Sequence, residues 1–427
     1  PNLPGAEPGR FITSLNVEET IPEEHRGVGF FWNCNDFNPC LGGLTKNIRL
    51  HIKPMVYLTL PLYSNLRTKG IYIYGKDYDI KEKTAVICSD AEVRNESGSP
   101  IQALIRTTVA DHTGRSILSF TSEETEILPA KDLDTAMRLS ITPADAYEKT
   151  EHGYRARGEE EVGPVETDSI DCTNICSQAR AEELRFWCCE DPYLYTVTTE
   201  LICGETVMDR VETVTGFRKV SYDGQEGLKV NDVRVWLTGY AQRAANEWAA
   251  IGAATDWLKD MDAQLIRESS ANHIRFMHVA GCPADIRSFD RFGVICTQPA
   301  GDKERENFGR QWKQRVELMR DVIIYFRNSP SIFFWETGNN SISKEHMREM
   351  RLIKETLDPM GGRFIGCRTI NTEEVICEAE YVGTMLNRHA ARFQSERMPV
   401  TETEYLREEA PRRVWDDFTP PDYDYDN

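Results

Sequence analysis

The residues with the clearest chemical potential follow one short apolar run. The run Ile332–Trp335 has the composition of a buried strand, and it ends in the polar residues Glu336, Asn339 and Asn340. A carboxylate can accept or deliver a proton, whereas an amide only donates and accepts hydrogen bonds. In a parallel barrel, polar tips of this kind lie at the carboxyl ends of the strands, where these folds carry their chemistry. The segment therefore predicts a functional site at the mouth of a barrel, with Glu336 facing its interior.

A second candidate segment lies near the end of the sequence. Glu402 and Glu404 alternate with threonines in the strand-like run Val400–Tyr405, so both carboxylates fall on one face, roughly 6.6 Å apart if the run is extended. Glu404 is closer to the carboxyl end of the run and therefore closer to the mouth of a barrel. Of the two, Glu404 is therefore the stronger candidate for a place in a site at the mouth, and the alternative is that both are solvated surface glutamates.

The elements that must position these residues alternate in type through the second half of the sequence. Apolar runs are followed by amphipathic helical runs, for example near Ala284–Phe292 and Gly309–Phe326. This repetition predicts a parallel sheet wrapped by helices, and polar strand ends favour a (β/α)8 barrel. The expected strands are Val233–Leu237, His273–His278, Val294–Gln298, Ile332–Trp335, Phe364–Cys367, Val375–Glu380 and Val400–Tyr405. With about seven strands, such a barrel should look incomplete at its C-terminus.

The first half of the sequence has a different pattern. Short β-rich runs such as Thr84–Ser89 and Ile101–Ala110 are separated by turn residues, which is typical of antiparallel sandwiches. The segment Tyr147–Ala179 is acidic and poor in large apolar side chains, which predicts a long loop or an insertion. The fold expected from both halves is therefore multidomain, with β-sandwich structure followed by an α/β barrel.

Length and composition fit two or three packed domains. The chain has 427 residues, of which 40% are hydrophobic, so extensive disorder is not expected. Its net charge of −19 argues against binding to nucleic acids or to anionic membranes, because both partners require a basic surface. No apolar run approaches about 18 residues, so no membrane-spanning helix is expected.

Neither the first residues nor the cysteines add a specific function. The start, Pro1–Gly5, has the character of neither a signal peptide nor an initiator sequence, which leaves a periplasmic, secreted or cytoplasmic location open. Cys172 and Cys176 lie four positions apart and Cys188 and Cys189 are adjacent, which is not the ligand spacing of a zinc site. We expect most of the cysteines to be buried thiols, and we expect no metal or cofactor.

Five segments, in order over most of the chain, resemble motifs of glycoside hydrolase family 2. The segment Arg327–Asn340 is similar to the family pattern R-N-H-P-S-I-x-x-W-x-x-G-N-E. The others are Leu41–Asn47, Thr215–Arg218 with Val230–Asp232, Asn272–His278, and Asp290–Val294. The resemblance implies a partial sugar-binding jelly roll in residues 1–60, an immunoglobulin-like β-sandwich in residues 61–217, and a (β/α)8 catalytic barrel in residues 218–427.

The resemblance also implies a retaining β-glycosidase, which needs two carboxyl groups about 5–5.5 Å apart. Glu404, followed by the aromatic Tyr405, matches the nucleophile of the family. Asn340 stands where the family has its acid/base glutamate, and an amide cannot deliver a proton. Glu336 cannot take that place on an extended strand, because it would lie roughly 13 Å from Asn340.

Further residues are expected to bind substrate. The resemblance implies that Arg275 supports the nucleophile carboxylate, that His278 contacts sugar hydroxyls, and that Asn339 binds the sugar 2-OH. The alternative for the first two is a core salt bridge and a satisfied core histidine. Three more residues are expected to line the site or contact the sugar, although an aromatic side chain is more often part of a core: Gln242, Trp335 and Glu336.

The expected activity is therefore hydrolysis of terminal β-linked sugars from oligosaccharides or polysaccharide-derived glycosides by double displacement. β-Galactosides are the first choice of substrate, and β-glucuronidase or β-mannosidase specificity is the alternative. A second hypothesis is a catalytically impaired carbohydrate-binding relative, because Asn340 replaces the acid/base residue. Assembly into a homo-oligomer is left open.

Overall fold

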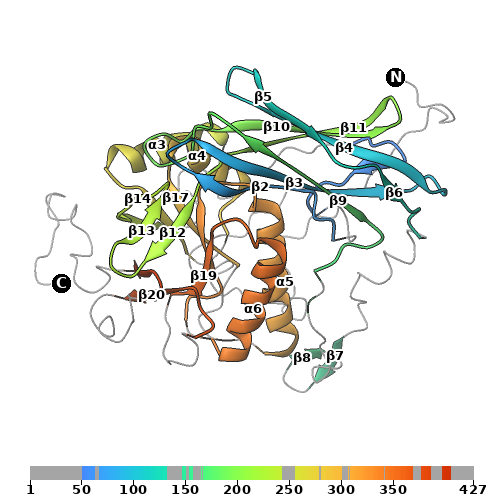
Figure 1. Ribbon diagram of the computed structural model, residues 1–427. Helices are drawn as coiled ribbons and strands as arrows, with labels where there is room; N and C mark the ends of the chain where they lie inside the picture. The colour runs from blue at the N-terminus through green and yellow to red at the C-terminus, as the bar shows by residue number, and fades with distance from the viewer. Residues whose placement is uncertain are drawn as a thin grey trace, which may run out of the picture.

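The computed structural model describes residues 51–62, 67–131, 147–150, 153–156, 165, 167–242, 255–277, 280–300, 306, 308–340, 342–368, 377–385 and 397–404. Within these ranges the chain forms a β-sandwich and a parallel sheet with flanking helices (Figure 1). The segments of residues 1–50 and 405–427 lie outside the described part, and with them nearly all of the expected jelly roll.

The sandwich consists of two antiparallel sheets. One contains β1 (Val56–Leu58), β2 (Ile71–Asp79), β3 (Thr84–Asn95) and β9 (Thr173–Ala181). The other contains β4 (Ile101–Ala110), β5 (Ser116–Thr121), β6 (Thr125–Ile127), β10 (Tyr195–Cys203) and β11 (Thr206–Thr215). Alternate residues of β10 are buried, as expected for a strand with one face on a core. Because β1 pairs with β3, the sandwich begins before the predicted boundary at residue 61.

The described residues of the second unit contain a sheet of seven parallel strands. In spatial order these are β15 (Gly239–Gln242), β16 (His273–Phe276), β17 (Ile295–Pro299), β18 (Ile332–Glu336), β19 (Phe364–Cys367), β20 (Tyr381–Met385) and β21 (Val400–Glu404). The sheet curls, so that Cα atoms of its two edge strands, β15 and β21, come within 8 Å of each other. The described residues thus confirm a barrel-like β/α unit after a β-rich first half.

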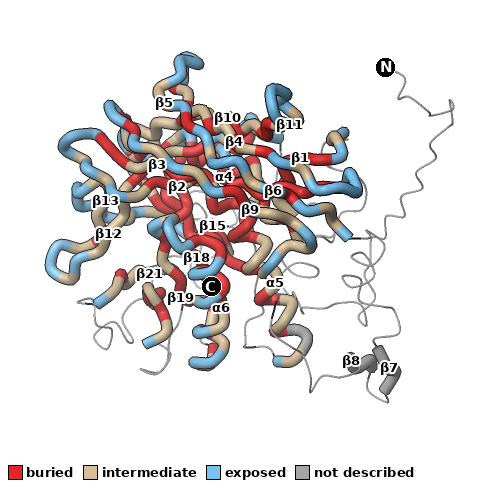
Figure 2. Tube along the Cα trace, turned by 45° about the vertical axis from the view of Figure 1, so that its right-hand side comes forward, coloured by how far each residue is buried: buried red, intermediate tan, exposed pale blue. Residues whose placement is uncertain are grey.

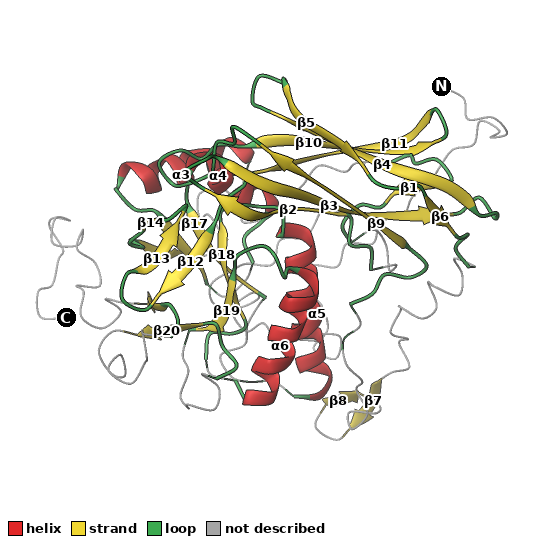
Figure 3. Cartoon of the chain, in the orientation of Figure 1, coloured by secondary structure: helices red, strands yellow, loops and turns green. Residues whose placement is uncertain are grey.

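In the described ranges, four helices connect strands of this sheet: α3 (Asp256–Glu268), α4 (Pro283–Phe292), α5 (Gly309–Phe326) and α6 (Lys344–Leu357). Figure 3 shows α5 and α6 side by side, and Figure 2 shows the buried residues concentrated along the strands. Local sequence sets the helix ends. Pro283 occupies the first turn of α4, and Gly293 ends it at φ 73°, where an added Cβ would meet the Cys189 carbonyl oxygen at 2.3 Å.

Two predicted strands are wrong. Val233–Leu237 is not the first barrel strand, because β14 (Val233–Arg234) pairs antiparallel with β13 (Gly227–Val230), which pairs with β12 (Val220–Asp223). Val233 is exposed there, whereas a barrel strand is buried. The strand expected at Val375–Glu380 starts instead at Tyr381, and its described residues 377–380 form a turn followed by a bend. The Glu380 carboxylate in that bend accepts hydrogen bonds from Lys354 and from the Ile365 amide.

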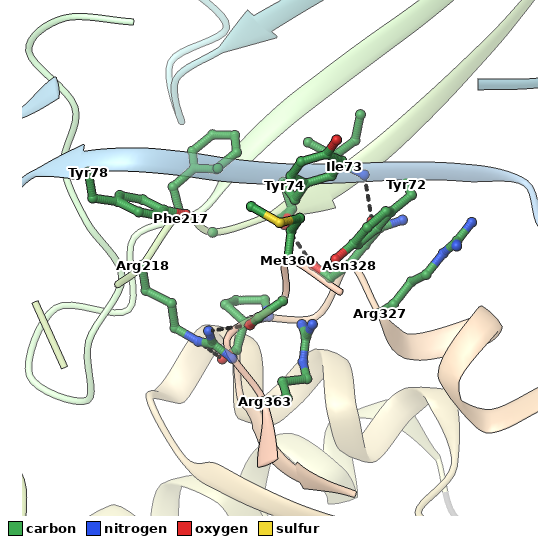
Figure 4. A pocket seen from close by; sticks show the side chains of 15 residues that line it. Tyr72, Ile73, Tyr74, Tyr78, Phe217, Arg218, Arg327, Asn328, Met360 and Arg363 are labelled. Atoms are coloured by element: carbon green, nitrogen blue, oxygen red, sulfur yellow. Dashed lines mark hydrogen bonds between the residues drawn. The ribbon is translucent and has the colours of Figure 1, made fainter. Parts of the chain in front are cut away.

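The loop before β18 joins the two units. The side-chain amide of Asn328 donates to the Ile71 carbonyl and accepts from the Ile73 amide of β2, at 2.8 and 2.9 Å. The Arg218 guanidinium donates to the carbonyl oxygens of Pro330 and Ile332. Figure 4 shows this junction, where three buried arginines, Arg218, Arg327 and Arg363, line a small pocket under Tyr72. The sandwich therefore holds the amino end of the strand whose carboxyl end carries the candidate site.

Two remaining expectations concern membranes and cysteines. Within the described ranges, no helix combines the length and apolar character needed to span a membrane. Ten cysteines fall in the described part, and all are free thiols. Of these ten, only Cys88, Cys189, Cys296 and Cys367 are buried. The expectation that most of the cysteines are buried is therefore wrong for the described cysteines.

Candidate active site

A buried ion pair lies inside the parallel sheet at the end of β18. Arg275 of β16 donates from Nη2 to Glu336 Oε1 at 2.6 Å and from Nε to Oε2 at 2.7 Å. Both side chains are 1% exposed. The same Nη2 donates to Asn339 Oδ1 at 3.0 Å. This two-pronged geometry fixes the position of both partners, because a guanidinium and a carboxylate match in shape.

Tyr381 of β20 lies beside this pair. Burial raises the pKa of Tyr381 well above its ordinary value, and the negative charge of Glu336 adds to the effect. Its ring packs against Phe334, with centroids 4.9 Å apart. The phenol therefore stays protonated next to the carboxylate.

His273 stands two residues before Arg275 on β16 and is also buried. Its Nε2 lies 2.9 Å from Thr297 Oγ1 on the neighbouring strand. Burial, and next the positive charge of Arg275, lower the pKa of His273 to about 4. The imidazole is therefore neutral in the folded protein at neutral pH.

The lowered pKa of His273 predicts that the folded state loses stability in acid. Between its folded pKa of about 4 and the ordinary value near 6.5, the unfolded chain binds the extra proton, so stability falls as pH falls. From about pH 7 to about pH 5 the loss due to His273 should be about 2 kcal/mol. Urea unfolding at both pH values should show that His273→Gln loses about 2 kcal/mol less than the unmodified chain. Equal losses in the two proteins would contradict this origin.

The amide of Asn340 faces a fixed positive charge. Arg368, which directly follows β19, donates from Nη2 to Asn340 Oδ1 at 3.1 Å and from Nε to the Asn339 carbonyl at 2.9 Å. Arg368 is buried and Asn340 half-buried. A guanidinium accepts no hydrogen bond, so the amide oxygen must point toward it. The position expected to hold a proton donor therefore sits beside a permanent cation.

The predicted site residues have different outcomes. Asn339 and Arg275 are brought together, and Glu404 is the last residue of β21, with its Cα paired to Met385. The side chain of Glu404 lies outside the described part, so its contact with Arg275 stays a prediction. His278 also lies outside the described residues. Gln242 ends β15, half-buried, and its buried Oε1 has no hydrogen-bond partner among the described residues.

One predicted substrate contact, that of Trp335, needs correction. Trp335 is fully buried, and its Nε1 donates to Asp358 Oδ2 at 3.0 Å. It belongs to the cluster of buried side chains between strands and helices and is not available to a sugar. Glu336 faces the interior of the sheet and accepts one hydrogen bond from Arg275 on each of its oxygens, so its contact with a sugar stays a prediction. Its described role is to hold Arg275.

Sequence reasoning missed Arg368 and Tyr381. Arg368 could have been found, because it directly follows the predicted strand Phe364–Cys367, at the end where barrel sites lie. Tyr381 was hidden by the wrong placement of the sixth strand. No group of three or more His, Cys, Asp or Glu side chains suited to a metal ion occurs in the described part of the chain.

The fold and site define a structural class: a curled parallel β/α sheet behind a β-sandwich, with polar residues gathered at the strand carboxyl ends. Comparison with known proteins identifies the family within this class. Residues 71–218, which include most of the sandwich, match the family model for glycosyl hydrolases family 2. The chain is 30% identical over 398 residues to a β-glucuronidase of Formosa agariphila, covering 93% of this chain and 36% of that protein.

Two further known proteins are similar to this chain. The β-galactosidase BoGH2A of Bacteroides ovatus is 27% identical over 214 residues, which is 48% of this chain and 24% of that protein. A solved structure of a β-glucuronidase from glycoside hydrolase family 2 matches with a TM-score of 0.75 and 26% identity, over 95% of this chain and 38% of that chain. The chain belongs to glycoside hydrolase family 2, as its five motifs predicted, and it spans about a third of the length of that Formosa relative.

Proposed function

We propose that this chain is part of a retaining β-glycosidase, with Glu404 as the nucleophile that attacks the anomeric carbon. One observation carries the proposal: the carboxyl ends of β18 and β21 belong to one parallel sheet, with Asn339 held by Arg275 at the first and Glu404 ending the second. Carboxyl ends of barrel strands converge on one rim, where a sugar ring can contact several of them.

We further propose β-glucuronides as the substrates, ahead of the β-galactosides that the sequence favoured. The support is that the relative matched over 93% of this chain and the solved structure matched over 95% of it are both β-glucuronidases. β-Galactosidases are also among the relatives, over a smaller share of the chain. β-Galactosides therefore remain the second choice.

The test uses paired aryl glycosides. The chain is incubated with 2,4-dinitrophenyl β-glucuronide and with the matching β-galactoside, and release of dinitrophenol is followed. Faster turnover of the glucuronide supports the assignment, and faster turnover of the galactoside reverses it. A 2-deoxy-2-fluoro glycosyl fluoride of the preferred sugar should add one sugar mass to the peptide that contains Glu404. Labelling elsewhere would contradict Glu404 as the nucleophile.

A second function, carbohydrate binding without turnover, is favoured by the contact between Arg368 and Asn340. An amide held beside a cation is a fixed hydrogen-bonding group that cannot exchange protons with a substrate. Calorimetric binding of glucuronic acid together with no release of dinitrophenol would support this function over hydrolysis.

The same contact predicts the effect of restoring the family glutamate. Asn340→Glu alone should leave the rate on phenyl β-glucuronide within about threefold, because Arg368 favours the ionised carboxylate over the protonated donor. The double change Asn340→Glu with Arg368→Gln should raise that rate about tenfold, because the carboxyl can then hold its proton. Steady-state rates of the two variants decide. An equal gain from the single change would show that Arg368 does not control position 340.

A further inference from the structure

A paired glutamate and histidine lie at the amino ends of α5 and α6. His346 Nδ1 and Glu306 Oε1 are 2.5 Å apart, and the same carboxylate oxygen accepts from the Ser343 amide at 2.7 Å. Helix amino ends in a β/α unit lie at the side where the preceding strands end. Glu306 and His346, here called the rim pair, are therefore on the side of the sheet that carries Asn340.

The imidazole of the rim pair is held in one orientation. It stacks on Trp312 with ring centroids 3.7 Å apart and an angle of 12°, and Phe308 lies 5.7 Å from it. Trp312 is fixed in turn by a hydrogen bond from Nε1 to Glu349, at 2.6 Å. The side chain of His346 is 17% exposed, and among the described residues Nε2 has no hydrogen-bond partner. One ring nitrogen is therefore bound to a carboxylate, while the other has no partner within the described part of the chain.

The rim pair is tied to the loop that carries the deficient position. Ser343, which binds Glu306, is the N-cap of α6 and lies three residues after Asn340. Three residues of chain span at most about 10 Å. The carboxylate is thus docked on the loop of Asn340 itself.

The carboxylate of the rim pair has a lowered pKa. Burial acts to raise the pKa of Glu306, but the hydrogen bonds from Ser343 and the charge of His346 outweigh it, and the net pKa lies below the ordinary value. Glu306 is therefore ionised. Two charged groups contact Trp312 itself: the Glu349 carboxylate accepts the hydrogen bond from its Nε1, and the Arg315 guanidinium lies 5.7 Å from its ring.

Building on the proposed glycosidase function, we infer that His346, oriented by Glu306, is the proton donor that Asn340 cannot be. A carboxylate on Nδ1 holds the proton there and stabilises the imidazolium, which leaves Nε2–H to be donated, as in other carboxylate–histidine pairs. As Glu404 forms its bond to the anomeric carbon, the glycosidic C–O bond breaks and its electron pair goes to oxygen. That oxygen takes the proton from Nε2. The neutral imidazole then removes a proton from the water that releases the sugar.

The experiment compares His346→Gln with His112→Gln. His112 is a matched control, because it is an exposed histidine of the sandwich whose Nδ1 also bonds one side chain, Tyr193. The substrates are phenyl β-glucuronide, with a poor leaving group, and 2,4-dinitrophenyl β-glucuronide, with a good one. In His346→Gln, the turnover rate on the phenyl glycoside should fall about 100-fold or more, and the pH–rate profile should lose its alkaline limb. His112→Gln should change neither the rate nor the profile.

Azide supplies a second readout. Azide needs no general base, so it should accelerate dinitrophenyl glycoside turnover by His346→Gln and yield glycosyl azide. It should leave the unmodified chain and His112→Gln unaffected. Glu306→Gln keeps the imidazole but removes its charge partner, and it should show a smaller loss with the same dependence on leaving group. It also tests the inference if His346→Gln fails to fold.

Each other outcome overturns the inference. Unchanged rates in both His346→Gln and Glu306→Gln would remove the rim pair from the reaction and leave the glycosidase proposal standing. Equal losses on both substrates without azide rescue would show a purely structural role. If the unmodified chain hydrolyses neither substrate, the proposed function fails and the inference fails with it.

Discussion

Glu404→Gln is expected to abolish hydrolysis while sugar binding persists. Gln has nearly the same size as Glu but no negative charge with which to attack the anomeric carbon. Removal of a catalytic nucleophile typically costs at least about 10⁴-fold in kcat. The measurement is turnover of 2,4-dinitrophenyl β-glucuronide, with calorimetric binding of glucuronic acid as the check that the site still forms.

Glu402→Gln is the matched control, because it makes the same chemical change two residues earlier on the same strand. It should retain activity within about tenfold, since position 402 lies deeper in the strand than the rim where substrates bind. The reverse result, an active Glu404→Gln and an inactive Glu402→Gln, would move the nucleophile to Glu402. Activity in both would exclude the strand β21 from the chemistry.

Arg275→Met should destabilise the fold by about 3–5 kcal/mol, because it leaves the Glu336 carboxylate buried without its partner. The change in unfolding free energy can be measured by urea denaturation. The double variant Arg275→Met with Glu336→Leu should recover most of the loss, because buried ion pairs can be replaced by apolar side chains at little cost. The double variant would also release Asn339, so its activity should stay low even when its stability returns.

The control for this prediction is Arg210→Met, which removes an exposed ion pair with Glu212. Both of its side chains are 56% exposed, and exposed pairs contribute at most about 1 kcal/mol. If Arg275→Met cost no more than Arg210→Met, the buried pair would not be a principal support of the site.

The larger plan of the fold could be predicted, because it rests on periodicity. Helices such as α5 and strands such as β19 coincide with their predicted ranges, since their apolar residues recur at the spacing that the element requires. The wrong strand assignments occur where a short apolar run pairs with a strand outside the sheet for which it was predicted. Val233 has strand character, but it pairs in a hairpin outside the barrel sheet. Local composition does not specify which sheet a short strand will join.

The site was predicted less completely, because burial cannot be read from residue type. Motif position identified Arg275 and Asn339 as site residues, and the structure brings them together. Motif position could not show that Glu336 would form an ion pair with Arg275, or that Trp335 would donate a hydrogen bond to Asp358. Glu306 and His346 lie 40 positions apart in sequence, so only the folded chain shows them as a pair.

The contact between Asn328 and β2 has a consequence for solubility. β2 is an edge strand, because within its sheet it pairs with β3 alone, and unpaired backbone groups of an edge can recruit strands from other molecules. The amide of Asn328 occupies two of those groups, at Ile71 and Ile73, in the way a neighbouring strand would. The barrel unit therefore covers part of this edge strand of the sandwich. A sandwich separated from its barrel would expose the edge and would be prone to associate with copies of itself.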